Sequence, residues 1–247
     1  MHKSSLAGAA ILGVLMVSPV NAAELKVIAG GSMTASLKEL GPRFEKTTGH
    51  KLDMTFAATP ELIKMATSAP FDLGVVPIDV MKNDAAKAKF AGTPANIAHI
   101  GYSVAVKAGA PKPDVSTPDA LKATLLKAQS IAVFPGSAAG AFVQKTFERL
   151  GIAEQIKDKM KVQAAPGAIP QAVAKGDAEL GVFLTNVLIA PDVELAGPFP
   201  GDLQQDLVFV GAVAADSKDA AAAKAFLDYL KTPEAVSVFK AKGVTAG

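Results

Sequence analysis

Hydrophobic and polar positions along the chain alternate between two spacings. Short apolar runs, such as 25–29, 72–76 and 179–184, have the length and composition of buried strands. Longer stretches between them, such as 33–44, place apolar residues three or four positions apart, which is typical of helices that bury one face. Strands that alternate with helices predict an α/β architecture with mostly parallel sheets.

Two extended apolar runs, 98–106 and 207–212, stand out from the other strand candidates because of their length. Runs of this kind can carry a chain from one lobe to another and back again. We therefore expect a two-lobed fold with two crossover strands. Residues 23–102 together with 208–247 would form lobe I, and residues 103–207 would form lobe II.

The first 22 residues have the pattern of a signal peptide. Lys3 supplies the positive start, residues 6–17 are continuously apolar, and Val20 to Ala22 place small side chains near a cleavage position. A helix that spans a membrane needs about 20 apolar residues, and this run is shorter. The sequence thus predicts cleavage of residues 1–22 and export of the remaining chain to the periplasm.

Composition excludes several classes of protein. The chain has 247 residues with 25 Lys+Arg, 23 Asp+Glu and no Cys. Without Cys there is no disulfide, no zinc site built from thiolates and no cysteine nucleophile. A formal net charge of +2 does not suggest a nucleic-acid partner, because such proteins usually carry a strong basic excess. With 50% hydrophobic and 19% charged residues, the chain is expected to fold.

Catalytic signatures are mostly absent. The sequence has no nucleophile elbow, no metalloprotease motif and no Gly-rich phosphate loop. We expect His50, after a helix-ending glycine, to lie in a solvated loop, and two isolated histidines make a metal-cation site unlikely to form. We therefore expect no enzyme activity, no cofactor and no metal. An exported hydrolase that uses Ser32 or Ser137 is the alternative from the enzyme class.

Small residues and hydroxyls gather where predicted strands give way to helices. A helix N-terminus presents free backbone N–H groups and a partial positive charge, and a hydroxyl adds one hydrogen bond. Several such ends could hold an anion without Lys or Arg. The alternative is that each hydroxyl only caps its own helix. The candidate ligand-binding residues at these junctions are Ser32, Thr59, Ser137, Ala138, Ala139, Thr185 and Asn186.

These junctions resemble those of a known family. With Gly30-Gly31-Ser32-Met33, Phe56-Ala57-Ala58-Thr59, Leu180 to Phe183 and the ending Ala225 to Leu230, the chain is similar to periplasmic molybdate-binding proteins of ABC importers. The resemblance covers nearly all of the chain after residue 22. It implies the type II periplasmic binding fold, in which a ligand is held in the cleft between two lobes and a permease reads the closed form.

The resemblance also implies roles for individual residues. Ser32 matches the first ligand serine of the family, and Thr59 falls near the second. Ala138 or Ala139 matches a backbone N–H donor, and Ile169 matches another. The family's ligand tyrosine aligns with Leu184, which cannot form a hydrogen bond, so that Thr185 or Asn186 would have to substitute for it.

The function that this resemblance implies is that of a solute-binding protein, with a molybdate-like or tungstate-like oxyanion as ligand and an inner-membrane ABC permease as partner. A monomer is expected. The position of Leu184 leaves a small organic anion as an alternative ligand. The same fold could also serve as a sensor without transport, because a fold does not determine a function.

Overall fold

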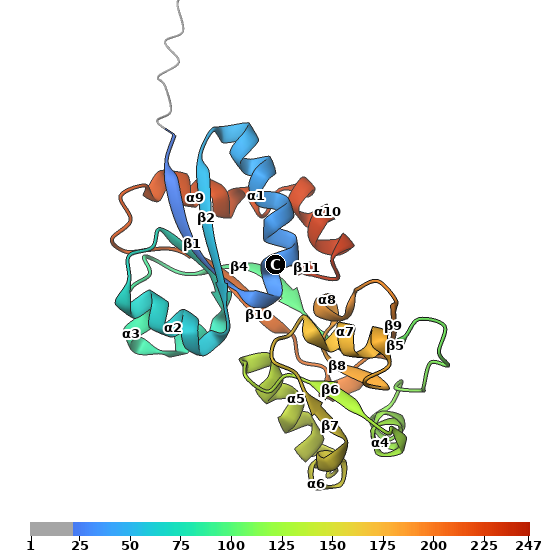
Figure 1. Ribbon diagram of the computed structural model, residues 1–247. Helices are drawn as coiled ribbons and strands as arrows, with labels where there is room; N and C mark the ends of the chain where they lie inside the picture. Colours follow the sequence, from blue (N-terminus) through green and yellow to red (C-terminus); the bar gives the residue numbers. More distant parts are fainter. Residues whose placement is uncertain (1–21) are drawn as a thin grey trace, which may run out of the picture.

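A computed structural model describes residues 22–247 of the chain. These residues form two sheets, one six-stranded and one five-stranded, each covered by helices (Figure 1). We call the six-stranded sheet with its helices the first lobe and the five-stranded sheet with its helices the second lobe. The predicted signal peptide lies outside the described residues except for Ala22. Within the described part, no helix is both long and apolar enough to cross a membrane.

The first lobe is built from both ends of the chain. Its strands, in spatial order, are β11 (Thr245–Ala246), β4 (Ala95–Ile100), β10 (Leu207–Val213), β3 (Leu73–Pro77), β1 (Glu24–Gly30) and β2 (Lys51–Ala57). Its helices are η1 (Gly31–Met33), α1 (Thr34–Thr48), α2 (Thr59–Ser68), η2 (Ile78–Lys82), α3 (Asp84–Lys87), α9 (Ala220–Tyr229) and α10 (Pro233–Ala241).

The second lobe is built from the middle of the chain. Its strands, in spatial order, are β7 (Met160–Val162), β6 (Ile131–Val133), β8 (Leu180–Leu184), β5 (Tyr102–Lys107) and β9 (Val193–Pro198). Its helices are α4 (Pro118–Lys127), α5 (Ala138–Arg149), α6 (Ala153–Ile156), η3 (Lys157–Lys159), α7 (Ala168–Lys175) and α8 (Thr185–Leu188). The short helix η4 (Gly201–Leu203) lies on the way back to the first lobe.

The pairing of the strands is mixed, where the sequence pattern predicted mostly parallel sheets. Strand β1 pairs in parallel with β2 and β3, and β6 pairs in parallel with β7 and β8. Strand β10 runs antiparallel to β3 and β4, and β5 runs antiparallel to β8 and β9. The α/β class is confirmed. Parallel pairing is confined to the strands joined through helices, because the crossover strands return against the direction of their neighbours.

The extended run predicted at residues 98–106 is divided between two strands, and the lobes meet at this division. Strand β4 ends at Ile100 and β5 begins at Tyr102, so Gly101 separates the two sheets. The carbonyl of Gly101 accepts hydrogen bonds from the backbone N–H and the hydroxyl of Thr185, at 2.8 and 3.0 Å. The side chain of Gln204, on the returning segment, pairs with both backbone groups of Tyr102 at 2.9 Å. The two crossover segments are thereby bonded to each other.

Tyr102 also anchors this junction through its ring. It is 2% exposed and packs on Phe142 and Phe199, with ring centroids 4.5 and 5.7 Å apart. Burial of the ring, helped by the negative charges of Asp79 and Asp206, raises the pKa of the Tyr102 hydroxyl. The tyrosine therefore stays neutral at physiological pH.

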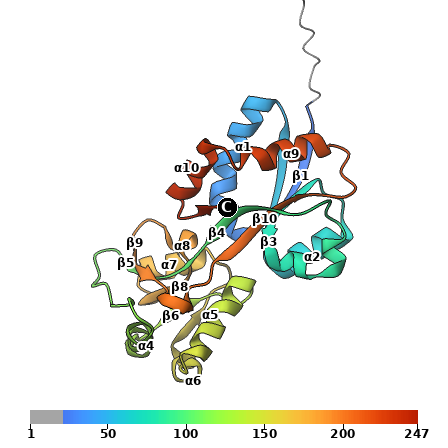
Figure 2. The same cartoon turned by 180° about the vertical axis from the view of Figure 1, so that it is seen from behind.

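Side chains on alternate positions of the first sheet enter different cores. In β1, Val27 belongs to the large hydrophobic cluster that extends under α1 and into the second lobe, whereas Ile28 belongs to a smaller cluster under α2 and α3. The two views in Figures 1 and 2 show helices on both faces of this sheet. Burial on both faces explains why the central strand β3, buried at every position, appears in the sequence as a continuous apolar run, whereas the edge strand β2 alternates.

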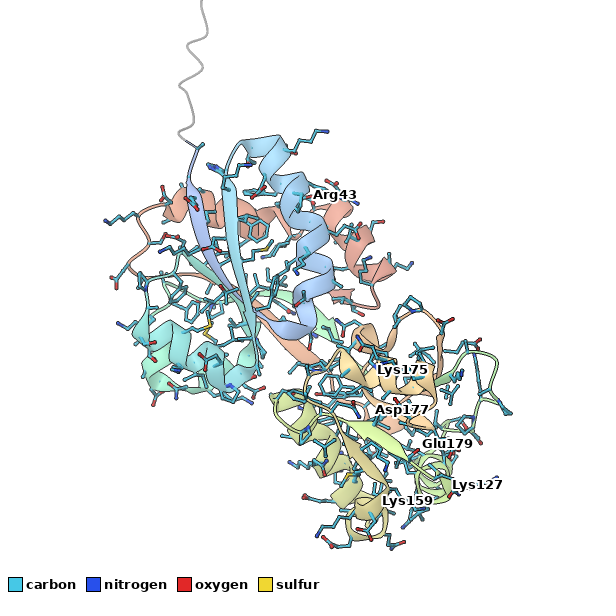
Figure 3. The ribbon with its side chains drawn as sticks, in the orientation of Figure 1. Arg43, Lys127, Lys159, Lys175, Asp177 and Glu179 are labelled. Carbon is cyan, nitrogen blue, oxygen red and sulfur yellow. The ribbon has the colours of Figure 1, made fainter. Side chains whose placement is uncertain are left out.

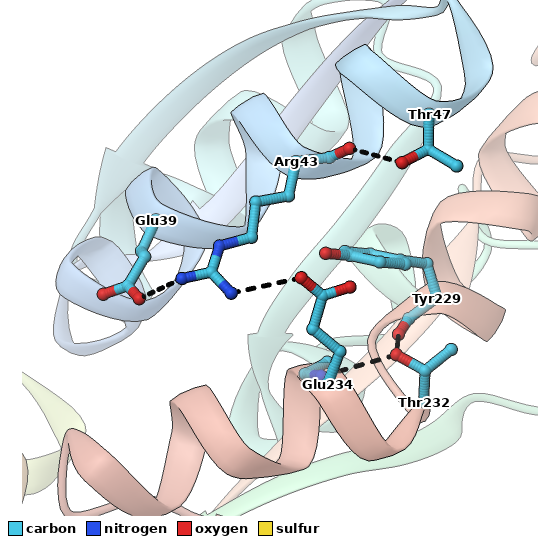
Figure 4. A network of polar contacts seen from close by, with 7 residues as sticks. Glu39, Arg43, Thr47, Tyr229, Thr232 and Glu234 are labelled. Atoms are coloured by element: carbon cyan, nitrogen blue, oxygen red, sulfur yellow. Dashed lines mark hydrogen bonds and ion pairs between the residues drawn. The ribbon is translucent and has the colours of Figure 1, made fainter.

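Helices α1 and α10 are joined by ion pairs at the surface (Figure 4). Arg43 lies 2.7 Å from Glu39 and 3.1 Å from Glu234, and Lys242 lies 3.0 Å from Glu39. The hydrogen bond from Lys242 lowers the pKa of Glu39, and the bond to Glu234 raises that of Arg43. The groups are solvated, so we expect each pair to stabilise the fold only slightly.

The structure differs from one local expectation, at His50, and it also carries a helix through a proline. Helix α1 runs through Gly41 and Pro42 without ending, although proline often interrupts a helix. Pro42 and Lys38 lie on the exposed side, where water can bond to the carbonyl that loses its partner. His50 is 6% exposed rather than solvated. Its ring stacks on Phe44 at 5.9 Å, and its Nδ1 accepts a hydrogen bond from the Ala23 N–H at 3.1 Å.

The start of α5 tolerates only glycine at position 140, which gives a test of the fold. A Cβ on Gly140 would overlap the carbonyl oxygen of Phe134 and approach Pro135 Cα to 2.7 Å. We expect Gly140→Ala to lower the free energy of unfolding by about 1–3 kcal/mol, because backbone cannot move aside cheaply. Urea denaturation measures this. Gly167→Ala is the control, since no atom lies within 4 Å of its Cβ position, and an equal loss in both variants would contradict the packing described.

Candidate functional site

A cavity of about 280 Å³ lies between the two lobes. Its walls come from strand ends and helix starts of the first lobe, from the corresponding loops of the second lobe, and from β10. The lining residues are Gly30, Gly31, Ser32, Phe56, Ala57, Ala58, Thr59, Pro77, Phe134, Ser137, Ala138, Ala139, Ala164, Ala165, Pro166, Leu207 and Phe209.

The topology explains why these segments meet. Strands β1 and β2 are parallel and in register, so that Gly30 lies beside Ala57 at their carboxyl ends. Strand β6 ends at Val133, and α5 begins five residues later. In open α/β sheets the ligand site lies beyond the carboxyl ends of the strands. Here two such edges face each other across one cavity.

Ser32 and Thr59 line the cavity with hydroxyls that do not cap helices. Helix α2 begins at Thr59, its N-cap is Ala58, and no side chain caps its first turn. Helix η1, which contains Ser32, also starts without a side-chain cap. The backbone N–H groups of a first helical turn have no partners within the helix. Both positions therefore combine an available hydroxyl with uncapped N–H groups at the cavity wall.

Ser137 is engaged differently. Its Oγ accepts a hydrogen bond from the Gly140 N–H at 3.1 Å and caps α5. The alternative of simple helix capping therefore describes Ser137, although it does not describe Ser32 or Thr59. Ala138 and Ala139 follow in the first turn of α5 and line the cavity with small side chains. An anion can approach their N–H groups closely for this reason.

The remaining three candidates do not line the cavity. Ile169 is fully buried, and its N–H donates to the Pro166 carbonyl at 3.1 Å. The hydroxyl of Thr185 bonds to Ser103 at 2.7 Å and to the Gly101 carbonyl. Asn186 donates from Nδ2 to the Ser32 carbonyl. Direct ligand contacts from these residues remain a prediction from the sequence.

Among the described residues, none that lines the cavity carries a charged side chain. Positive potential must therefore come from the helix starts, each equivalent to about half a unit charge at its N-terminus. Across residues 22–247, His, Asp and Glu side chains nowhere form a group of three that could hold a metal ion. The arrangement is suited to bind an anion through neutral donors.

Part of the lining was not expected from the sequence. Phe134 follows β6 directly, Pro77 is the last residue of β3, and Phe209 comes from the crossover strand β10. A Cβ on Gly30 would overlap the ring of Phe209, so this glycine lets the ring reach the strand end. Because they lie at strand ends, Phe134 and Pro77 could have been predicted to line the cavity. Phe209 could not, because only the topology of the sheet brings it there.

A larger hollow, of about 780 Å³, lies at the far end of the second lobe beside α4 and the loop after β5. Lys127 and Glu179 line it, and Lys175 and Asp177 lie near them in Figure 3. Charges of both signs surround it, and the Glu179 carboxylate already accepts a hydrogen bond from the Gln129 N–H at 2.7 Å. The lining carries Lys107, Lys112 and Lys127 against Asp114 and Glu179, and Lys112 is paired with Glu194 at 3.0 Å, so little excess of either charge is left for a ligand.

Comparison with protein families identifies the fold family. Residues 25–245 match the model of a family described as bacterial extracellular solute-binding protein. The chain belongs to this family. Among curated relatives, this solute-binding protein is 31% identical over 250 residues to a Pseudomonas protein named aconitate isomerase, with 94% of each chain covered. It is also 31% identical over 237 residues to molybdate-binding protein ModA of Azotobacter vinelandii, covering 93% of this chain and 92% of that one.

Solved structures support the same architecture. The periplasmic molybdate-binding protein of Azotobacter vinelandii superposes with a TM-score of 0.72 at 20% identity, covering 90% of this chain and 98% of that one. The tungstate-binding protein TupA of Desulfovibrio alaskensis gives 0.67 at 15% identity, covering 92% and 99%. At such identities the likeness concerns the fold, and it confirms the two-lobed binding-protein architecture.

Ser137 caps a helix and Ser32 does not, so we expect mutations of these two cavity residues to have different effects. We expect Ser137→Ala to lower the free energy of unfolding by about 1 kcal/mol, because the α5 cap is lost. Ser32→Ala should change it by less than about 0.5 kcal/mol, because its hydroxyl supports no helix. Thermal unfolding of the ligand-free variants measures both. Equal destabilisation by the two changes would contradict this division of roles.

Proposed function

We propose that this protein is the solute-binding component of an ABC importer and that it binds a tetrahedral oxyanion of the molybdate or tungstate class between its lobes. The observation that carries the proposal is the cavity wall itself, where free hydroxyls at two uncapped helix starts of the first lobe face the start of α5 in the second lobe, and none of the described lining residues is charged. The molybdate-binding and tungstate-binding relatives support the same class of ligand.

The proposed binding mode follows from the donors. The Ser32 and Thr59 hydroxyls would donate to the anion from the first lobe, and the N–H groups at Ala138 and Ala139 would donate from the second. A tetrahedral oxyanion offers oxygens in all directions, so donors from two lobes can be satisfied at once. Closure of the lobes would then remove water from the anion and strengthen each bond.

The cellular setting belongs to the same proposal. Cleavage of residues 1–22 would release the protein to the periplasm, where it would act as a monomer with a membrane permease as partner. Lobe I would comprise residues 23–102 and 208–247, and lobe II residues 103–207. These bounds differ by one residue from the sheets at each crossing, since Tyr102 begins β5 and Leu207 begins β10. The permease would meet both lobes once the ligand has closed them.

A small organic carboxylate is the second candidate ligand, and two observations favour it. One is the relative named aconitate isomerase. The other is the apolar part of the wall, formed by Phe56, Phe134 and Phe209, which suits a carbon skeleton better than an oxyanion. The lining favours binding over conversion, because proton transfer and ester hydrolysis both need a positioned acid–base side chain.

Calorimetric titration distinguishes these ligands. We expect molybdate to bind and sulfate to bind more weakly or not at all, and we expect Ser32→Ala to weaken binding by about 1–2 kcal/mol. The reason is the loss of one hydrogen bond to a charged acceptor. Lys64→Ala, on the exposed face of α2, is a control that should leave the affinity unchanged. A tricarboxylate that binds while molybdate gives neither heat nor a thermal shift would replace the oxyanion by the organic ligand.

Binding should depend little on pH between 6 and 8. The reason is that no cavity-lining side chain titrates in this range. Titrations with molybdate at several pH values would show a constant dissociation constant. A steep loss of affinity across this interval would implicate His50 or His99 and contradict the proposed donors.

A further inference from the structure

Helix α8 of the second lobe reaches the anion-binding loop of the first lobe. The Nδ2 of Asn186 donates a hydrogen bond to the carbonyl oxygen of Ser32 at 2.5 Å, although 154 positions separate the two residues. Asn186 lies outside the cavity lining, whereas Ser32 lies within it. The bond therefore holds the backbone carbonyl of Ser32, a residue that also lines the cavity.

A second contact holds α8 against the first lobe. A Cβ on Gly243, in the turn between α10 and β11, would lie 2.5 Å from Ile189 Cδ1 and 3.4 Å from Asn186 Cα. Gly243 has a φ of +70°, a conformation that favours glycine. The start and the end of α8 thus fit between the Ser32 loop and the Gly243 turn, and Figures 1 and 2 show α8 close to the C-terminus.

The same helix is bonded to the crossover between the lobes. Thr185, at its first position, donates to the Gly101 carbonyl through its backbone N–H and its hydroxyl. Two consecutive residues therefore bond to different places: Thr185 to the crossover segment and Asn186 to the cavity loop. A rotation of the lobes about Gly101 would have to change the Asn186–Ser32 bond.

The chemistry of the Asn186 side-chain amide determines which of its atoms bonds to Ser32. A carbonyl oxygen requires a donor, so Nδ2 and not Oδ1 must face Ser32. Asn186 Oδ1 is buried and has no hydrogen-bond partner among the described residues. A leucine at position 186 would match the shape of asparagine closely. It would remove the bond to Ser32 without sacrificing a bond of Oδ1.

We infer that Asn186 is a positioning residue that fixes the Ser32 carbonyl, and with it the Ser32 hydroxyl, when the lobes come together. This rests on the proposed function in one respect only, that Ser32 contacts the ligand. The position of α8 and the shape of the anion site are then linked by one amide, since the hydrogen bond is present while α8 lies against the loop. In this role Asn186 acts through Ser32 and needs no contact with the ligand.

The test compares Asn186→Leu with Asn96→Leu, the same change at an exposed position of β4 whose side chain bonds, among the described residues, only to His99. In the ligand-free protein, amide hydrogen exchange in residues 31–34, read at the Thr34 N–H that donates to the Gly31 carbonyl, should become at least about ten-fold faster in N186L and stay at the wild-type rate in N96L. With molybdate as probe, N186L should bind about ten-fold more weakly, mainly through faster dissociation. Asn186→Ala replaces N186L if the leucine variant does not fold.

The outcomes separate this inference from the proposed ligand class. Wild-type exchange at residues 31–34 in N186L would overturn the inference, as would a lower melting temperature with unchanged exchange and affinity. If wild-type protein binds no molybdate, the oxyanion proposal fails, and the exchange rates alone then support or overturn the positioning role. Gly243→Ala, which would push Ile189 and α8 away, should reproduce the exchange effect of N186L with Asn186 in place.

Discussion

The arrangement of the two lobes depends on how the crossover segments are bonded to each other. The Gln204 amide pairs with the N–H and the carbonyl of Tyr102 as a neighbouring strand would, and the Gly101 carbonyl accepts two hydrogen bonds from Thr185. Buried backbone groups need partners, and an interruption between two sheets would otherwise leave several without one. These bonds let the chain leave one sheet and enter the next at a single glycine. They also determine which strand ends face the cavity.

The cavity shows how the proposed anion site could be built from neutral groups. A buried cation would have to be desolvated in the ligand-free protein, which costs free energy unless a partner is always present. Backbone N–H groups at helix starts cost less to desolvate, because they are neutral and already held in place by the helix. Ser32 and Thr59 add hydroxyls, and the small residues before them, Gly31 and Ala58, keep the approach open. The near balance of charges in the whole chain agrees with this way of binding.

The sequence predicted the class of fold well and the site only partly. Short apolar runs and capping residues located most strands and helices, because burial and local capping leave a direct signal in the order of residues. The pairing direction of the crossover strands was missed, since it depends on where the chain returns. Ser32 and Thr59 could be predicted from their positions after strands. Phe209 could not, because a strand residue reveals neither its neighbours nor the close approach allowed by Gly30. Likewise, nothing in the sequence distinguishes a hydroxyl that caps its helix, as in Ser137, from one that does not.

The absence of charged groups along the cavity lining has a consequence for release of the ligand. An anion held by lysine or arginine can be freed by a competing ion or a change in protonation, because the strength of its bonds depends on charge. An anion held by amides and hydroxyls from two lobes does not depend on the protonation of its donors and is less sensitive to screening by salt. Its departure requires that the donors of one lobe move away from those of the other. Control of unloading would then belong to whatever separates the lobes mechanically, and changes of pH would have little influence on it.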